Sequence, residues 1–352
     1  MPAMEMRPEW LAALLAWPAI LGQTLIFGSA TLCVMLRLSA DIGEAASLSL
    51  ERMLRGWWRM FALKIALLMV LMFVNQVAGM AGTSWRGALP LLGEVLTQTH
   101  SGHTWEWRLP VAVALPIAAW MPLGDRARTL TLVILCAALM AQGCMLSHAI
   151  DFGLLAIAVR FTHMLAAGTW IGALFGYWVL ARSAGASSRI QREAARVLST
   201  LASWSVAILI ASGIYLAYQG LGHRVNHLIY SLYGRVLLLK LTGFSLVLAV
   251  GAYNRFWLVP AIDQPSARRA FLRTVSAEVL MLLGVIGLST LLAATPPARM
   301  SLSMIGGRES RVSYKVTREP GMRFEAIKPK PMVAERRTLI SLKPHKISDF
   351  SL

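Results

Sequence analysis

The residues of this chain best suited to chemistry are two histidines, His148 and His163, near the ends of neighbouring apolar segments. An imidazole ring among apolar side chains needs either a hydrogen-bond partner or a metal ion. Helical spacing places Trp170, seven residues after His163, on the same face of the second segment. The sequence therefore predicts a face that can hold a ligand. The alternative is that each ring only bonds a backbone carbonyl or caps a helix.

Another face of the same segment carries glycines at positions 168, 172 and 176. A spacing of four residues places them in one ribbon along an α-helix. Small residues at that spacing let a second membrane helix approach closely. We therefore expect a neighbouring helix to cross at this ribbon.

Two more pairs of histidines have spacings of interest. His100 and His103 are three residues apart, and His223 and His227 are four apart. Both spacings would place the two rings on one side of a helical turn. Each pair is a candidate site for metal capture, although both pairs fall in expected loops, where solvated histidines are ordinary.

The composition indicates which elements must position these side chains. The 352 residues are 57% hydrophobic and 14% charged, whereas about 25% of residues are charged in a soluble domain. The chain is therefore expected to be a polytopic membrane protein. Its net charge of +17 does not indicate nucleic-acid binding, because the basic residues lie mainly in alternate loops, as membrane topology requires. The three cysteines, at positions 33, 136 and 144, have no CxxC spacing and are expected to be small buried side chains.

Eight runs are candidates to cross a bilayer, which takes about 20 apolar residues. The predicted fold is thus an all-α bundle of about eight transmembrane helices. The run at 105–123 is the weakest of them, because it contains three prolines, which neighbouring helices must accommodate. The eight runs are 18–37, 61–81, 105–123, 129–147, 153–180, 199–219, 234–255 and 274–294.

The charge of the loops predicts how the bundle is oriented. The loops after the first, third, fifth and seventh runs, with their flanks, hold fifteen Lys and Arg residues, and the opposite side up to residue 298 holds seven. The positive-inside rule makes the first set cytoplasmic. Both termini then face outward, as do six of the seven histidines of the chain. This one-sidedness points to chemistry at the outer face.

The chain divides into four predicted parts. Residues 1–17 form an outward N-terminal segment. Two patterns occur twice in the chain. A glycine is followed six residues later by a basic residue near the start of the third and seventh runs, and an Arg-Thr pair occurs at 128–129 and 273–274. These repeats suggest two parallel four-helix halves, 18–150 and 151–298. Residues 299–352 are basic and lack a long apolar run, so this tail is expected to be disordered.

Three charged residues within the runs are candidates for structural or relay roles. Glu278 lies near the cytoplasmic end of the eighth run, close to where Arg255 ends the seventh. The leading interpretation is an ion pair that locks the two helices, and the alternative is a proton or ion relay. Lys240 is expected to extend its amine toward the outer surface.

Several motifs together resemble the copper resistance protein D (CopD) family. Ser147-His148-Ala149 and the stretch His163-Met164-Leu165-Ala166-Ala167-Gly168-Thr169-Trp170-Ile171-Gly172 look like two of its signatures. Further similarity lies in Ala211–Tyr215, Tyr233–Leu241, Asn254-Arg255, Glu278 and Thr295-Pro296-Pro297. Ser147 departs from the family pattern, where a glycine is expected. The resemblance covers roughly 18–298.

The resemblance implies an inner-membrane protein that imports copper from the periplasm to the cytoplasm and receives it from a periplasmic carrier protein. It also makes copper the metal for His148 and His163. Imidazole is a good ligand for copper, and thioether sulfur suits Cu(I), so Met164 or Met145 is expected nearby. The chain has no Gly-x4-Gly-Lys-Ser/Thr motif and no Cys-Pro-Cys, which disfavours an ATP-driven pump and predicts a protein that is not an enzyme.

Two other functions stay open at this point. In a b-type cytochrome, His148 and His163, or one of them with a histidine of another helix, would bind haem iron. In a non-transporting membrane factor, the same residues would help to deliver copper to a cuproenzyme.

Overall fold

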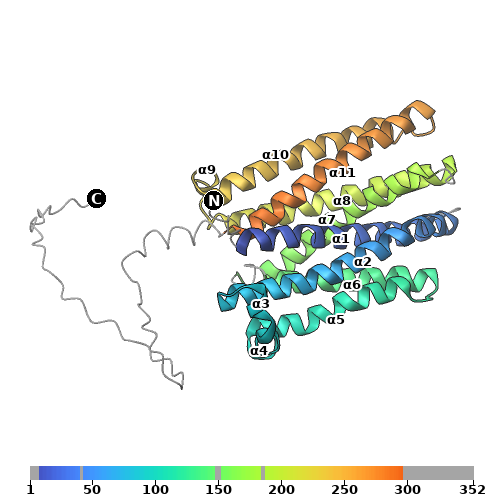
Figure 1. The fold of residues 1–352 in the computed structure, drawn as a ribbon. Coiled ribbons are helices and arrows are strands. Elements are labelled where there is room, and N and C mark those ends of the chain that lie inside the picture. The colour runs from blue at the N-terminus through green and yellow to red at the C-terminus, as the bar shows by residue number, and fades with distance from the viewer. Residues whose placement is uncertain (1–7, 40–42, 147–151, 184–186, 296–352) are drawn as a thin grey trace, which may run out of the picture. The chain divides into compact units, whose positions relative to one another are not determined.

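A computed structural model describes residues 8–39, 43–146, 152–183 and 187–295. Long α-helices make up most of this part of the chain, and it contains no β-strand (Figure 1). The helices are α1 (Pro8–Leu38), α2 (Gly43–Ala81), α3 (Trp85–Ala88), α4 (Leu92–Gln98), α5 (His100–Trp120), α6 (Asp125–Met145), α7 (Leu154–Arg182), α8 (Ser188–Gly220), α9 (His227–Tyr230), α10 (Leu232–Tyr253) and α11 (Pro265–Ala294). A short 3-10 helix, η1 (Leu89–Leu91), joins α3 to α4, and a π-helical turn, η3 (Asn254–Leu258), extends α10.

Hydroxyl side chains mark where several helices begin. Thr99 caps α5 by accepting a 2.9 Å hydrogen bond from the Gly102 amide. Ser231 caps α10 in the same way, through the amide of Gly234 at 2.9 Å. Such caps satisfy backbone donors that have no partner within the helix. They fix the ends of the two helices that carry the predicted glycine-to-basic spacing.

The predicted all-α membrane bundle is confirmed. Within the described residues, seven helices are long and apolar enough to cross a membrane: α1, α2, α6, α7, α8, α10 continued into η3, and α11. The remaining predicted span, the third run at 105–123, corresponds to α5, which has 21 residues but is not among the seven candidates. Its two internal prolines, with histidine, glutamate and arginine in its sequence, explain why it is less apolar than the other long helices.

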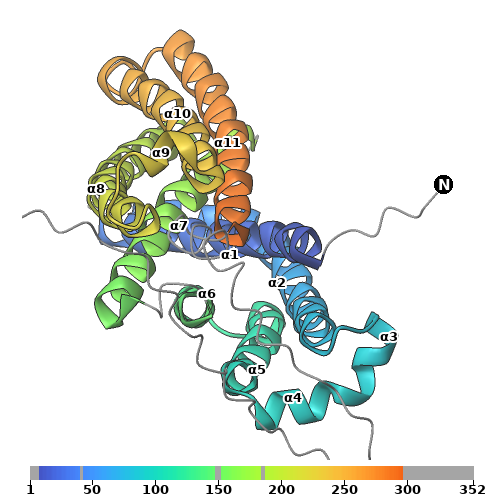
Figure 2. The ribbon, with the colours of Figure 1, turned by 90° about the vertical axis from the view of Figure 1, so that its left-hand side faces the viewer.

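Two groups of helices pack against each other along α1 and α7. The first helix group is α1, α2, α5 and α6, and the second helix group is α7, α8, α10 and α11. Helix α1 contacts α2 and α6 of its own group, and it also contacts α7, α8 and α11 (Figure 2). The division at residue 150 into two repeated halves stays a prediction.

Glycines bring α1 and α7 into close contact, as the ribbon predicted. A Cβ atom on Gly28 of α1 would lie 2.1 Å from the carbonyl oxygen of Gly168. A Cβ on Gly172 would lie 2.3 Å from the carbonyl oxygen of Thr24. Both distances are far below van der Waals contact, so only glycine fits at this crossing. The interface between the two helix groups is therefore closed by backbone contact.

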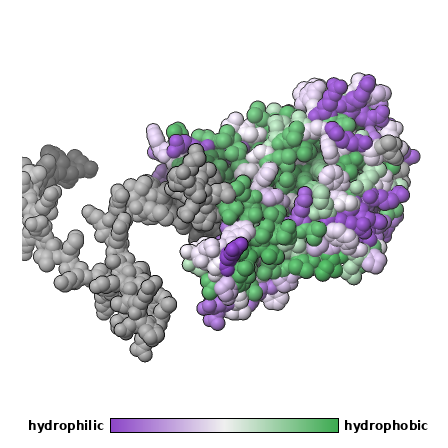
Figure 3. All heavy atoms as spheres, viewed as in Figure 1, coloured by the Kyte–Doolittle hydropathy of each residue, from purple (hydrophilic) through white to green (hydrophobic). Residues whose placement is uncertain are grey.

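Hydrophobic residues form a broad band across the face of the bundle shown in Figure 3. Hydrophilic residues gather at the end where α1 passes into α2, α5 into α6, α7 into α8 and η3 into α11 (Figures 1 and 3). These four turns follow the first, third, fifth and seventh predicted runs. The structure thus brings the basic loops of the sequence to one end of the bundle.

Candidate functional site

His163 joins two helices of the second helix group near the end opposite the basic loops. It lies in the third turn of α7 and is half-buried. Its Nδ1 is 2.8 Å from Oγ of Ser212 on α8. The ring also packs over Gly213, where a Cβ would lie 3.6 Å from its Cε1 atom. The Ser212-Gly213 pair belongs to one of the motifs of the family resemblance, and its role here is to seat the His163 ring.

Two basic side chains lie near the His163 ring. Arg160, one turn earlier on α7, and Lys240 on α10 are both close enough to interact with it electrostatically. Lys240 is half-buried between the helices, and no hydrogen bond or ion pair is found for its amine within the described ranges. Whether that amine extends to the outer surface, as expected from the sequence, stays a prediction. The surroundings of His163 are therefore polar and positively charged.

A pair of sulfur atoms lies beside this cluster. Sγ of Cys144, near the end of α6, is 3.5 Å from Sδ of Met164 on α7. Cys144 is buried and Met164 is half-buried. The guanidinium groups of Arg108 and Arg160 are close enough to interact with the Cys144 side chain. Met164 was a predicted ligand and Cys144 was not, because the sequence indicated only a small buried side chain.

The remaining predicted ligands are separate from one another or lie outside the described ranges. His148 falls in 147–151 and is not described by the structure. His100 and His103 are exposed in the first turn of α5, where His103 Nδ1 is 3.2 Å from Glu106 Oε2. His223 and His227 bond different partners, the side chain of Gln219 at 3.0 Å and the backbone carbonyl of Leu221 at 2.8 Å. Among the described residues, no three His, Cys, Asp or Glu side chains gather in a metal-binding cluster.

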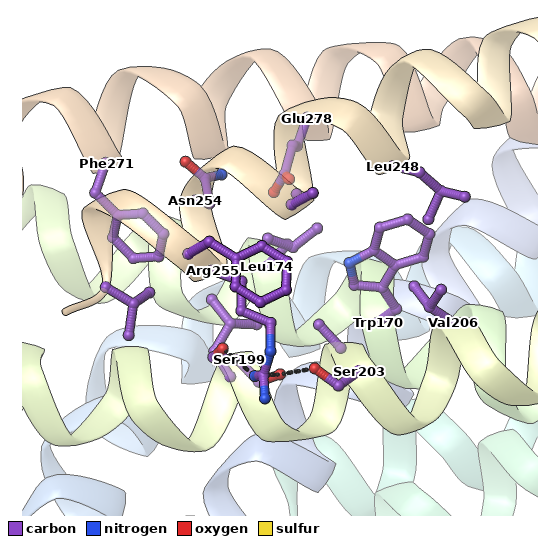
Figure 4. A pocket seen from close by; sticks show the side chains of 16 residues that line it. Trp170, Leu174, Ser199, Ser203, Val206, Leu248, Asn254, Arg255, Phe271 and Glu278 are labelled. Carbon is purple, nitrogen blue, oxygen red and sulfur yellow. Dashed lines mark hydrogen bonds between the residues drawn. The ribbon is translucent and has the colours of Figure 1, made fainter.

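A cavity of about 400 Å³ lies toward the basic-loop end of the second helix group. Figure 4 shows it between α8 and α10, with the ring of Trp170 at one end. Trp170 is 3% exposed and packs edge-on against Phe244 of α10, with ring centroids 6.1 Å apart. Its predicted face thus holds both His163, near the end opposite the basic loops, and the cavity.

The predicted ion pair between Glu278 and Arg255 is not formed. Nη1 of Arg255 instead donates to Oγ and to the carbonyl oxygen of Ser199 on α8, at 2.7 and 3.1 Å (Figure 4). Glu278 is 2% exposed on α11 and lines the cavity. Arg255 lies in the π-helical turn, whose wider register departs from the α-helical spacing that the prediction assumed.

The glycine contacts close the α1–α7 interface. The cavity lies inside the second helix group.

Sequence reasoning missed Cys144, Ser212 and Asn254. Cys144 and Met164 are twenty positions apart across the turn between α6 and α7, and that separation gives no distance. Asn254 is 4% exposed and lines the cavity, but in the sequence its charged neighbour Arg255 was the more obvious candidate. The Ser212 motif was visible, but its partner on α7 was not.

Comparisons with known proteins agree with these features. Residues 6–154 match the family model described as copper resistance protein D-like, N-terminal domain, and residues 192–292 match that of copper resistance protein D. Copper resistance protein D from Pseudomonas syringae pv. tomato is 28% identical over 221 residues, which cover 59% of this chain and 70% of that protein. No solved structure matches. This multi-pass membrane protein therefore belongs to the copper resistance protein D family.

Proposed function

We propose that the protein binds copper at the outer end of the second helix group and imports it across the inner membrane, from periplasm to cytoplasm. In this proposal both termini face the periplasm, and a periplasmic carrier protein supplies the ion. The loop charges support the orientation, and membership of the family supports copper as the substrate. The protein acts as a carrier and catalyses no reaction.

The observation that carries the proposal is the 3.5 Å contact between Cys144 Sγ and Met164 Sδ. Thiolate and thioether are the protein ligands that select Cu(I). On binding, the Cys144 thiol loses its proton to solvent as the sulfur–copper bond forms, since a coordinating thiol is deprotonated. The resulting Cu(I)–thiolate pair is electrically neutral, so Arg108 and Arg160 do not oppose it as they would oppose a bare cation.

His163 is the nitrogen ligand closest in sequence to this sulfur pair, and His148 completes the predicted set. The neutral imidazole binds copper through the nitrogen that is not hydrogen-bonded, and Ser212 holds the other nitrogen of His163. The other two pairs, His100 with His103 and His223 with His227, serve as weaker capture sites at the outer surface.

Metal content and the absorption spectrum of the detergent-purified protein test the proposal. The wild type is expected to hold roughly one copper per chain on its soft ligands, and His163→Ala, His148→Ala and Met164→Leu are expected to lower that content. Cys136→Ser is the control, because Cys136 lies on α6 and is as deeply buried as Cys144. A Soret band that disappears in the histidine variants would establish a haem protein and contradict the copper proposal.

A further inference from the structure

Two buried polar atoms in residues that line the cavity of the second helix group have no hydrogen-bond partner among the described residues. They are Oε1 of Glu278 and Nδ2 of Asn254, in residues that are 2% and 4% exposed. Both residues line the cavity from the same side (Figure 4). A buried polar group without a partner costs free energy. The pair therefore indicates that something polar occupies this side of the cavity.

The neighbours of Asn254 decide which polar group would fit. Its Oδ1 accepts a hydrogen bond from Oγ1 of Thr274 on α11, which leaves the amide NH₂ as the free end. The Asn254 amide lies near hydrogen-bonding range of the Glu278 carboxyl, but Nδ2 and Oε1 do not complete a bond with each other. One donor and one acceptor thus lie side by side. A hydroxyl group complements both, because it accepts from Nδ2 and donates to Oε1.

The rest of the cavity calls for an apolar body. Its volume of about 400 Å³ would hold roughly a dozen waters at about 30 Å³ each, and each water needs two to four polar partners. The polar groups Ser199, Ser203 and Arg255 already bond one another. Most of the wall is apolar, with Leu174, Leu198, Val206, Leu248, Val259 and Phe271. The volume lies within the range of small-molecule pockets, which is about 300–1,000 Å³.

Access to the cavity is from the side of the bundle. Helices α8 and α10 do not pack closely against each other, and both are candidate membrane spans. The exposed surfaces of these helices are apolar, with Trp204 on α8, Leu246 on α10 and Phe256 on η3 all more than half exposed. A ligand can therefore enter from the hydrocarbon phase. Turns of π-helix are frequent at functional sites, and η3 forms part of this wall.

We propose that this cavity binds an apolar, hydroxyl-bearing molecule from the lipid phase. Its hydroxyl lies between Asn254 Nδ2 and Glu278 Oε1, and its hydrocarbon body lies along α8 and α10. The site is distinct from the copper ligands at the outer end. Its occupancy does not depend on copper binding, so each proposal can fail without the other.

Photolabelling of the full-length protein in nanodiscs tests this site. The probe is a diazirine-bearing octanol, and peptide mass spectrometry maps the labelled residues. Labelling is expected within 198–206 on α8 and 248–252 on α10, with competition by decanol but not by decane. If decane reduces the labelling of these peptides as strongly as decanol does, the hydroxyl assignment is wrong.

Two pairs of variants sharpen the test. Ala202→Trp fills the cavity and should abolish labelling, whereas Ala207→Trp, on the exposed side of α8, should not. Glu278→Gln keeps an acceptor oxygen and should retain labelling. Glu278→Leu lacks that acceptor and should weaken decanol competition roughly two- to tenfold, as expected for one lost hydrogen bond. Two results would overturn the proposal. One is equal labelling of Ala202→Trp and wild type. The other is no labelling in the wild type, which is the result that a water-filled or cation-binding cavity would give.

Discussion

The two helix groups contain the same kinds of helix but differ in how their second and third long helices meet. In the first helix group, α2 and α5 pack through Phe73 and Trp105, whose ring centroids are 5.4 Å apart, and through a 2.9 Å hydrogen bond from Trp105 to Gln76. In the second helix group, α8 and α10 do not pack closely, and the Arg255–Ser199 hydrogen bonds bridge them at the wall of a cavity. The second and third long helices are thus joined by side-chain packing in one group, whereas in the other a cavity lies between them.

Two buried carboxylates show the same difference. Glu51 of α2 and Glu278 of α11 are both 2% exposed. Glu51 pairs with Arg37 of α1 and accepts a 2.9 Å hydrogen bond from Thr129 of α6. In the other group Thr274, at the equivalent position in the Arg-Thr repeat, bonds Asn254, and Glu278 has no ion pair among the described residues. The first carboxylate joins three helices, and the second faces a cavity.

The largest expected effect comes from exchanging these two carboxylates for amides. Glu51→Gln leaves Arg37 buried without a counter-charge, so we expect a loss of roughly 3–5 kcal/mol in the free energy of unfolding. Glu278→Gln breaks no ion pair and should change stability by less than about 1 kcal/mol. Thermal unfolding of the purified protein in detergent measures both. Equal losses would remove the distinction between the two groups.

The α1–α7 interface gives the next effect. Gly28→Ala places a Cβ atom 2.1 Å from the Gly168 carbonyl oxygen, and overpacking of this kind costs about 1–3 kcal/mol or more. Gly79→Ala on α2 is the control, because nothing lies within 4 Å of its Cβ position. It should be neutral or stabilise by about 0.5–1 kcal/mol. A wild-type melting temperature for Gly28→Ala would contradict a closed interface.

Enlarging one alanine in each group compares their free space directly. Ala112 of α5 is 1% exposed in the packed core, so Ala112→Leu should cost about 1–3 kcal/mol. Ala202 lines the cavity, and Ala202→Leu should stabilise by about 0.5–2 kcal/mol, as cavity-filling changes commonly do. Unfolding midpoints of the two variants are expected to move in opposite directions. Destabilisation by both would mean that the cavity is already filled by well-ordered side chains.

The smallest effect is expected at the bridge between α8 and η3. Arg255→Ala removes exposed hydrogen bonds to Ser199, which should cost no more than about 1 kcal/mol. The gap between the helices should nevertheless widen. Pulsed electron paramagnetic resonance would detect this as a longer distance between spin labels at the exposed positions 204 and 246. An unchanged label distance would show that Arg255 does not hold the two helices together.

Most of the fold could be predicted from the sequence, because apolar runs and positively charged loops report membrane topology directly. Helices α2 and α8 extend well beyond their predicted spans, since charged residues such as Arg52 and Arg192 continue a helix outside the apolar run. The glycine ribbon predicted close packing but could not identify α1 as its partner. Spacing along one helix does not reveal which helix lies opposite.

The candidate site was predictable only in part. His163, Met164 and Trp170 stand out as polar or aromatic residues at meaningful spacings on α7. Cys144 and Ser212 become important only through contacts with α7 from neighbouring helices. The Glu278–Arg255 pair was predicted on α-helical geometry, and a π-helical turn of five residues was enough to redirect Arg255. Contacts between helices and local irregularities are the information that single-sequence patterns lack.

The most direct test of the copper proposal is X-ray absorption at the copper edge on the Cu(I)-loaded protein. We expect sulfur ligands in the wild type and in Cys136→Ser, and loss of that sulfur contribution in the Cys144→Ser, Met164→Leu double variant. Copper bound only through nitrogen or oxygen in the wild type, or an unchanged sulfur contribution in the double variant, would contradict copper binding by the Cys144–Met164 pair.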